Sequence, residues 1–227
     1  MIDLHSHLLP GLDDGPEEVS ETLEIIKEMS FFGYVEIIPT PHKFHSLFNP
    51  DPNTVTERIS SLNKTMVRRF SFEYMCNIPQ IKALTDHREF SRTRTGYKVI
   101  MVEFSSPLVS KKEIDSSVFS LNAGGFIPLL AHIERYLKED NFWIELRKKY
   151  KVFFQSSVRT LAKSSFNIKR RQVIRFLEKG IIDNLGTDLH RATQLESVEK
   201  GLTFFTNNFS GIGKDLFSDK FLFEAGE

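Results

Sequence analysis

The sequence predicts an α/β fold in which seven strand–helix units form one closed or nearly closed barrel. Short apolar, β-branched or aromatic runs recur along the 227 residues, and helical patterns lie between them. No linker or change in composition divides the chain. Alternation of strands and helices is typical of a parallel sheet. We therefore expect a single domain over residues 1–227.

The predicted elements follow from hydrophobic periodicity and from turn residues. Strands are expected at 1–5, 34–39, 70–76, 98–104, 126–131, 151–156 and 182–187. Helices are expected at 17–32, 52–68, 111–123, 138–149, 167–179 and 192–207. In the first helix, Val19, Leu23 and Ile26 recur at three- to four-residue steps, and Gly33 is a plausible stop.

Composition and charge exclude several classes of protein. The 30 basic and 30 acidic residues give a net charge of zero, so we expect no nucleic-acid partner. No apolar run is long enough to span a membrane, and Asp3 and His5 interrupt any signal peptide. The one cysteine, Cys76, excludes an intrachain disulfide. We expect a cytoplasmic protein, and no pattern indicates its oligomeric state.

Residues of the kind that bind metals lie in or just after six of the seven predicted strands. They are His5, His7, His42, Glu73, Glu103, His132, Asp188 and His190, with Asp14 in the first loop. Each one alone is typical of a structural residue or a turn. In α/β barrels, however, the carboxyl ends of the strands carry the chemistry. Clustered carboxylates and imidazoles with few nearby cations need a partner, and zinc, manganese or iron suits this mixture. Nine ligands fit two or three ions.

Several motifs resemble those of the polymerase and histidinol phosphatase (PHP) superfamily. They are HSH, TPH, the two strand glutamates, LLAHIERY and GTDLH. Within the superfamily, MIDLHSHLLPGLDDG together with AHIERY is most similar to the bacterial protein-tyrosine phosphatases of capsule and exopolysaccharide loci. The resemblance extends from residue 1 to about residue 191. It implies a distorted (β/α)7 TIM-like barrel, the PHP fold, with a trinuclear metal site.

The resemblance also implies a role for each ligand. The first metal would be held by His5, His7, Glu73 and Asp188, and the second by Glu73 as a bridge, Glu103 and His132. The third would be held by Asp14, His42 and His190. Arg135 matches an arginine that contacts the substrate phosphate. The chain departs from the family at Leu195, where a second phosphate-binding arginine is common, and Arg191 is the candidate replacement.

The implied activity is metal-dependent hydrolysis of phosphotyrosine on a bacterial tyrosine kinase of capsule or exopolysaccharide synthesis. Our hypothesis is that a hydroxide bridging two metals attacks phosphorus, while Arg135 holds the phosphoryl oxygens. The alternatives are another PHP phosphoesterase, acting on histidinol phosphate, a small metabolite or a nucleotide, and a non-catalytic metal-binding protein. A cysteine-dependent tyrosine phosphatase is excluded because Lys82 stands six residues after Cys76, where that mechanism needs arginine.

Overall fold

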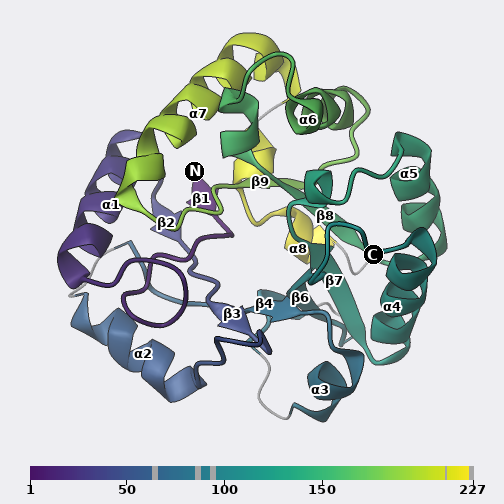
Figure 1. Cartoon of the computed structure of the whole chain (residues 1–227), viewed down its shortest axis with the longest axis horizontal. Coiled ribbons are helices and arrows are strands. Elements are labelled where there is room, and N and C mark those ends of the chain that lie inside the picture. The colour runs from purple at the N-terminus through teal and green to yellow at the C-terminus, as the bar shows by residue number, and fades with distance from the viewer. Residues whose placement is uncertain (63–65, 85–87, 93–95, 213, 225–227) are drawn as a thin grey trace.

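The computed structural model describes residues 1–62, 66–84, 88–92, 96–212 and 214–224, and it has an α/β architecture. Figure 1 shows the helices α1 to α7 arranged around a centre of short strands. The strands are β1 (Ile2–Asp3), β2 (Glu36–Ile37), β3 (His42–Lys43), β4 (Glu73–Met75), β5 (Ser91–Arg92), β6 (Lys98–Glu103), β7 (Phe126–Leu130), β8 (Phe153–Ser157) and β9 (Asn184–Gly186). The α-helices are α1 (Val19–Phe31), α2 (Pro52–Ser61), α3 (Ile78–Ala83), α4 (Lys111–Ala123), α5 (Asp140–Lys149), α6 (Ile168–Glu178), α7 (Leu195–Phe209) and α8 (Phe221–Glu224). The 3-10 helices are η1 (Ile133–Arg135), η2 (Val158–Ala162), η3 (Ala192–Gln194), η4 (Ser210–Ile212) and η5 (Lys214–Phe217).

The strands form two sheets, and nearly all of their pairings are parallel. β1 pairs with β2, and the larger sheet has the order β3-β4-β6-β7-β8-β9. The exception is β5, which is antiparallel to β6. The predicted parallel α/β class is therefore confirmed.

The predicted closed or nearly closed barrel is not confirmed. Within the described residues, strand pairing stops between β2 and β3, where Pro39 and Pro41 provide no N–H for a continuous ladder. Between β9 and β1, an isolated bridge from Ser6 to Leu189 is the one strand pairing that joins the two sheets among the described residues. In the part of the chain that the structure describes, the strands thus do not form a closed barrel.

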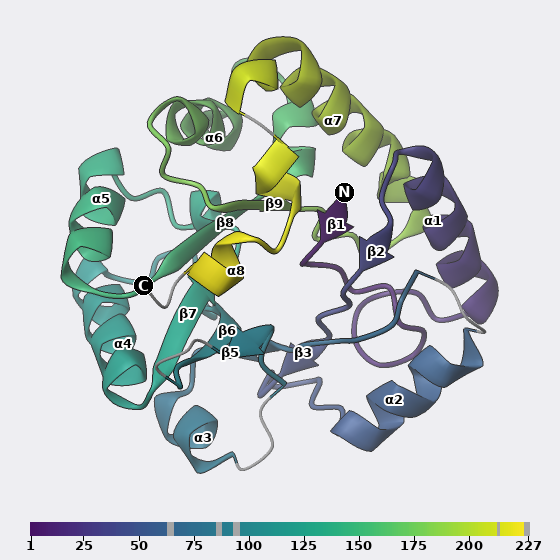
Figure 2. The same cartoon turned by 180° about the vertical axis from the view of Figure 1, so that it is seen from behind.

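The strands of the larger sheet are buried on both faces. Along β6, Ile100 and Val102 belong to the large apolar cluster shared with the helices, while Val99 and Met101 belong to a second, smaller cluster. This alternation follows from the two-residue period of a strand. In Figure 2, α8 lies over the strands β7 and β8. Leu222 of α8 is fully buried and belongs to the smaller cluster. A double-sided core explains the continuous apolar run that predicted this strand.

Several elements differ from the prediction. Helix α3 was not expected, and it forms because Asn77 caps it by accepting from the N–H of Gln80, with proline in the first turn. The predicted helix 52–68 ends at Ser61. The predicted strand 34–39 shortens to β2 next to Pro39. Of the helices in the described part of the chain, none is both long and apolar enough to cross a membrane.

Candidate metal centre

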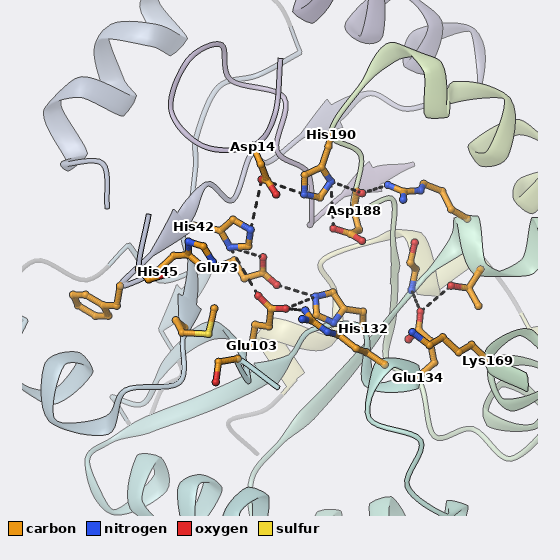
Figure 3. A pocket seen from close by; sticks show the side chains of 18 of the residues that line it. Asp14, His42, His45, Glu73, Glu103, His132, Glu134, Lys169, Asp188 and His190 are labelled. Atoms are coloured by element: carbon orange, nitrogen blue, oxygen red, sulfur yellow. Dashed lines mark hydrogen bonds and ion pairs between the residues drawn. The ribbon is translucent and has the colours of Figure 1, made fainter. Parts of the chain in front are cut away.

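All nine predicted ligands lie together, in the parallel strands or in the segments that follow them. The register pairs His42 of β3 with Glu73 of β4, and Met75 of β4 with Glu103 at the end of β6. His132 and Asp188 follow β7 and β9 by two residues each. Figure 3 shows these side chains converging on one cavity. The topology of parallel strands therefore brings together residues that are far apart in the sequence.

The carboxylate of Glu73 lies at the centre of the cluster and is almost fully buried. Its Oε2 is 3.4 Å from His5 Nε2, 3.2 Å from His7 Nε2 and 3.2 Å from His42 Nδ1. Its Oε1 is 3.2 Å from His132 Nε2. Two ligand atoms bound to one tetrahedral zinc ion would lie about 3.4 Å apart, so these separations match the edges of a coordination shell.

The hydrogen bonding of Glu73 also indicates a metal site. Despite the short contacts, neither carboxylate oxygen has a partner with hydrogen-bond geometry among the described residues, and the same holds for His42 Nδ1 and His132 Nδ1. Buried polar atoms without partners are costly. Cations between these atoms would satisfy them, so the donor set fits divalent metal ions.

Three overlapping groups of ligand atoms are compact enough to hold an ion each. Within each group the atoms lie within 4.8 Å of one another. The groups are His7, Asp14, His42 and His190; His5, His7 and Glu73; and His42, Glu73 and Glu103. Asp188 Oδ1 lies 3.6 Å from His5 Nε2, and His132 Nε2 lies 3.5 Å from Glu103 Oε1, so the two remaining residues border these groups.

Backbone conformation is unusual at this face. The non-glycine residues of the described chain with positive φ are Phe44, His132, Leu137 and Asp188. All four lie in segments that follow strands, and His132 and Asp188 are predicted ligands. Such conformations cost free energy and concentrate at functional sites. At His132 and Asp188, just after β7 and β9, this backbone conformation accompanies side chains that line the cavity.

Two residues that support the ligands were missed by the sequence analysis. Asp13, which the sequence suggests is part of a turn, has Oδ2 2.7 Å from His7 Nδ1 and accepts from the N–H of His42. Gln155 Oε1 accepts from the N–H of His132 and lies 3.3 Å from His5 Nδ1. A polar residue inside the apolar strand 151–156 was the available signal for Gln155, which is fully buried. Both side chains orient imidazoles from outside the cluster.

A glycine makes room for this arrangement. A Cβ atom at Gly186 would lie 2.6 Å from Gln155 Nε2 and 2.8 Å from His5 Cβ, closer than real side chains approach. The glycine of GTDLH thus permits β9 to pack directly against the ligand His5 and its support.

The electrostatics of the cluster favour charged carboxylates and a neutral His42. Burial raises the pKa of Glu73, but the nearby His5 and the other imidazoles outweigh it and hold the pKa well below its usual value. Asp188 shows the same balance, with His5 and His132 keeping its pKa low against burial. Burial, and then the charge of His7, lower the pKa of His42 to about 4. Burial lowers the pKa of His7 and His132, but Asp13 outweighs it at His7 and Glu73 at His132, so both pKa values are raised. Metals bind ionised carboxylates and neutral imidazole, so a metal ion would displace a proton from these two rings.

The cluster opens into a cavity of about 1020 Å³. Arg135 lines it, and Nη1 of that guanidinium contacts Glu103 Oε1. Arg159, from η2, lines it as well. Arg191 is not among the lining residues, and its Nη1 lies 3.5 Å from Glu21 Oε2. The predicted contact of Arg191 with phosphate stays a prediction, and from this position it would require the pair with Glu21 to open.

The fold and the cluster together define an α/β protein with a histidine–carboxylate site at the ends of its parallel strands. Residues 1–200 match the family described as capsular polysaccharide synthesis, CpsB/CapC, and the chain belongs to this family. Among curated proteins, it is 25% identical over 202 residues to the tyrosine-protein phosphatase CpsB of Streptococcus agalactiae serotype III (strain NEM316), covering 84% of this chain and 83% of that protein. It is 27% identical over 140 residues to the tyrosine-protein phosphatase YwqE of Bacillus subtilis (strain 168), covering 60% of this chain and 55% of that protein.

Solved structures share the fold. A chain from the crystal structures of YwqE from Bacillus subtilis and CpsB from Streptococcus pneumoniae, described as unique metal-dependent tyrosine phosphatases, matches with a TM-score of 0.76 and 23% identity, covering 92% of this chain and 87% of that one. Dihydropyrimidinase from Brevibacillus agri NCHU1002 matches with a TM-score of 0.56 and 10% identity, covering 89% of this chain and 61% of that one. The resemblance inferred from the motifs is confirmed at the level of the family.

Proposed function

We propose that this protein is a metal-dependent protein-tyrosine phosphatase that acts on a bacterial tyrosine kinase of capsule or exopolysaccharide synthesis. The observation that carries the proposal is the buried Glu73 carboxylate, which lies within 3.4 Å of four imidazoles and has no hydrogen-bond partner among the described residues. Curated relatives in the same family are named tyrosine-protein phosphatases. Together these favour hydrolysis of a phosphomonoester at this cluster.

We assign two or three ions of manganese, iron or zinc to the nine ligands. His5, His7, Glu73 and Asp188 would hold one ion; Glu73, Glu103 and His132 a second; and Asp14, His42 and His190 a third. Bound ions would stabilise charge on the phosphoryl oxygens and supply an activated water as nucleophile.

The protein's own residues would position the substrate and the ligands. Arg135 lines the cavity beside Glu103 and offers a planar fork of donors for two phosphoryl oxygens. Asp13 and Gln155 hold His7 and His5 in fixed orientations. A tyrosine leaving group has a pKa of about 10, so it departs without a strong general acid.

Exposed apolar side chains in the loops after the strands favour a protein substrate over a small metabolite. Large apolar side chains are exposed in three such loops: Leu47 after β3, Leu108 after β6 and Phe166 after β8. Exposed apolar side chains of this size are typical of surfaces that contact another protein. This observation favours a phosphotyrosine protein over the alternative substrates of PHP phosphoesterases, such as histidinol phosphate or nucleotides.

We also propose that residues 1–227 form one domain with a distorted (β/α)7 arrangement whose ladder is interrupted. Backbone bonds between the two sheets support this. The N–H of Asp188 donates to His5 O at 2.7 Å, and the N–H of His7 donates to Leu189 O at 2.8 Å. The segment after β9 therefore runs beside the segment after β1.

The activity is tested by comparing substrates on the metal-loaded protein. We expect a phosphotyrosine peptide to be hydrolysed with a higher kcat/KM than the matched phosphoserine peptide or histidinol phosphate. A chelator and the isosteric change Glu73→Gln should both abolish the activity. Preference for histidinol phosphate would select the alternative phosphoesterase, and hydrolysis of no phosphomonoester would overturn the proposal.

A further inference from the structure

Three basic residues, here called the basic wall, line one side of the cavity. They are Arg159 of η2, Lys163 directly after it, and Lys169 in the first turn of α6. All three belong to the connection between β8 and α6. Figure 3 shows Lys169 on the opposite side of the cavity from His45. The wall is separate from Arg135, which follows β7.

Arg159 borders the ligand cluster, and its acceptors within the described ranges of the chain are neutral groups. Its Nη1 donates to the backbone oxygen of Asp188 and, at 2.9 Å, to Gln194 Oε1. His190 uses the same two acceptors, through its Nδ1 and its backbone N–H. Among the described residues, no carboxylate forms an ion pair with Arg159, so its charge is not neutralised where it enters the cavity.

The two lysines are likewise without carboxylate partners in the part of the chain that the structure describes. Some lysines elsewhere form such pairs: Lys149 Nζ lies 3.0 Å from Asp115 Oδ1, and Lys179 Nζ lies 2.7 Å from Asp140 Oδ2. The one carboxylate of the cavity lining that is not a predicted ligand is Glu134, which is buried and accepts from Ser157 N and Thr160 Oγ1. The wall thus carries positive charge available to a ligand.

We propose that the basic wall is a second anion subsite, which binds an acidic side chain of the peptide next to the phosphotyrosine. This inference rests on the proposed function and names the substrate class more closely. The ligand cluster and Arg135 are enough to bind one phosphoryl group. The three cations of the wall are not needed for that and can bind a second anionic group. A cavity of about 1020 Å³ also lies at the upper end of the range for small-ligand sites. It has room for residues that flank the phosphotyrosine.

The occupant is a peptide because the same connection also exposes apolar surface. Phe166 is 87% exposed and Ile168 is 57% exposed, and both lie between Lys163 and Lys169 in the sequence. An isolated anion would gain nothing from such neighbours, whereas a peptide chain would pack against them. The acidic group is either a carboxylate or a second phosphate, which share the same charge complementarity with the wall.

The test compares phosphotyrosine peptides that differ only in the flanking residues. Neutral, aspartate-flanked, lysine-flanked and doubly phosphorylated peptides are assayed with the wild type, Lys163→Ala/Lys169→Ala and Lys163→Glu/Lys169→Glu. We expect the wild type to favour the aspartate-flanked over the neutral peptide roughly fivefold in kcat/KM, through KM, as partly exposed ion pairs allow. The ratio should fall toward one in the alanine variant, which keeps only Arg159 of the wall, and reverse toward the lysine-flanked peptide in the glutamate variant.

Lys148→Ala/Lys149→Ala, in the last turn of α5 and outside the cavity lining, is the matched control and should keep the wild-type ratio. A larger gain for the doubly phosphorylated peptide than for the aspartate-flanked one would identify phosphate as the occupant. Equal rates on neutral and acidic peptides in all variants would overturn the subsite.

The proposed function can fail without the subsite failing. In that case no peptide is hydrolysed, and fluorescence anisotropy of the unphosphorylated aspartate-flanked and neutral peptides provides the readout. Tighter binding of the acidic peptide that is lost in Lys163→Ala/Lys169→Ala would support the wall. Equal binding of both peptides would overturn it.

Discussion

Asp13 Oδ2 lies 2.7 Å from Nδ1 of His7, and this contact fixes the orientation of a predicted ligand. The ionised carboxylate accepts a hydrogen bond from Nδ1–H, and Nε2 of the same ring lies 3.2 Å from Glu73 Oε2. Burial raises the pKa of Asp13, but the neighbouring His7 outweighs it and the pKa lies below its usual value. The two adjacent aspartates thus have different roles. Asp13 supports a ligand, whereas Asp14 is itself a predicted ligand, and its Oδ1 lies 3.4 Å from His190 Nε2.

Replacing Asp13 should weaken the metal site without removing a ligand. We expect Asp13→Asn to lower metal affinity about 10- to 100-fold, the usual effect of losing such a support. Competition with a chelator of known affinity measures it. Asp115→Asn, which breaks a surface pair with Lys149, is the control. Unchanged affinity in Asp13→Asn would show that His7 needs no orienting partner.

The two predicted phosphate-binding arginines should differ in importance. Arg135 lines the cavity, whereas Arg191 is paired with Glu21 outside it. We expect Arg135→Ala to lower kcat/KM for a phosphotyrosine peptide about 100-fold, as loss of one donor to the transition state does. Arg135→Lys should recover part of this, because it keeps the charge but lacks the fork. A loss in Arg191→Ala as large as in Arg135→Ala would mean that the Glu21 pair opens when substrate binds.

Cys76 should be dispensable for hydrolysis and slow to alkylate. Burial raises the pKa of its thiol to about 11, although a contact with Ser117 opposes this. Only the thiolate is nucleophilic, so reaction with iodoacetamide should be much slower than for free cysteine at pH 8 and should increase up to pH 11. Cys76→Ser should keep wild-type kcat/KM. Loss of activity with an intact fold, checked by circular dichroism, would revive a cysteine mechanism.

The carboxyl group of Asp183 should make stability depend on pH. Burial raises its pKa from 3.8 to about 6, against the charge of Arg147 and a bond from the N–H of Phe154. The folded state therefore binds this proton more tightly than the unfolded state, so the stabilisation is full below about pH 4 and is lost as the pH rises through 6. The difference between the two pKa values corresponds to about 3 kcal/mol.

Urea unfolding of the wild type and Asp183→Asn at pH 4 to 7 measures this effect. Because the variant cannot titrate at this position, the free energy of unfolding of the wild type should fall relative to that of the variant as the pH increases. If the free energy of unfolding of the wild type instead increases relative to that of Asp183→Asn as the pH increases, the ion pair with Arg147 outweighs the effect of burial.

Most of the ligand set could be predicted because its members lie in or just after strands, and strands can be recognised in a sequence. His132 after FIPLL and Asp188 after NLG are placed by chain order and by the parallel direction of the sheet alone. The parallel class and most helices follow from the same local periodicity. Asp14 was found through its position in the first loop.

Features that depend on tertiary packing were not predictable in the same way. The interruption of the sheet depends on how the two prolines meet the neighbouring strands. The contacts of Gln155 with His5 and His132 join residues 150 and 23 positions apart. The pairing of Arg191 with Glu21 depends on how the segment after β9 lies against α1. Local sequence patterns contain no information about these contacts between residues that are far apart in the chain.

The central claim is that Glu73 joins the ions of one metal cluster, and elemental analysis of the purified protein tests it most directly. We expect two or three manganese, iron or zinc ions per wild-type chain, and at least one fewer in Glu73→Gln. His45→Ala is the control, because His45 stacks on His42 with ring centres 5.1 Å apart but belongs to none of the three ligand groups, and it should keep the wild-type content. A wild-type chain that hydrolyses phosphotyrosine without bound metal, or equal metal content in Glu73→Gln, would contradict the claim.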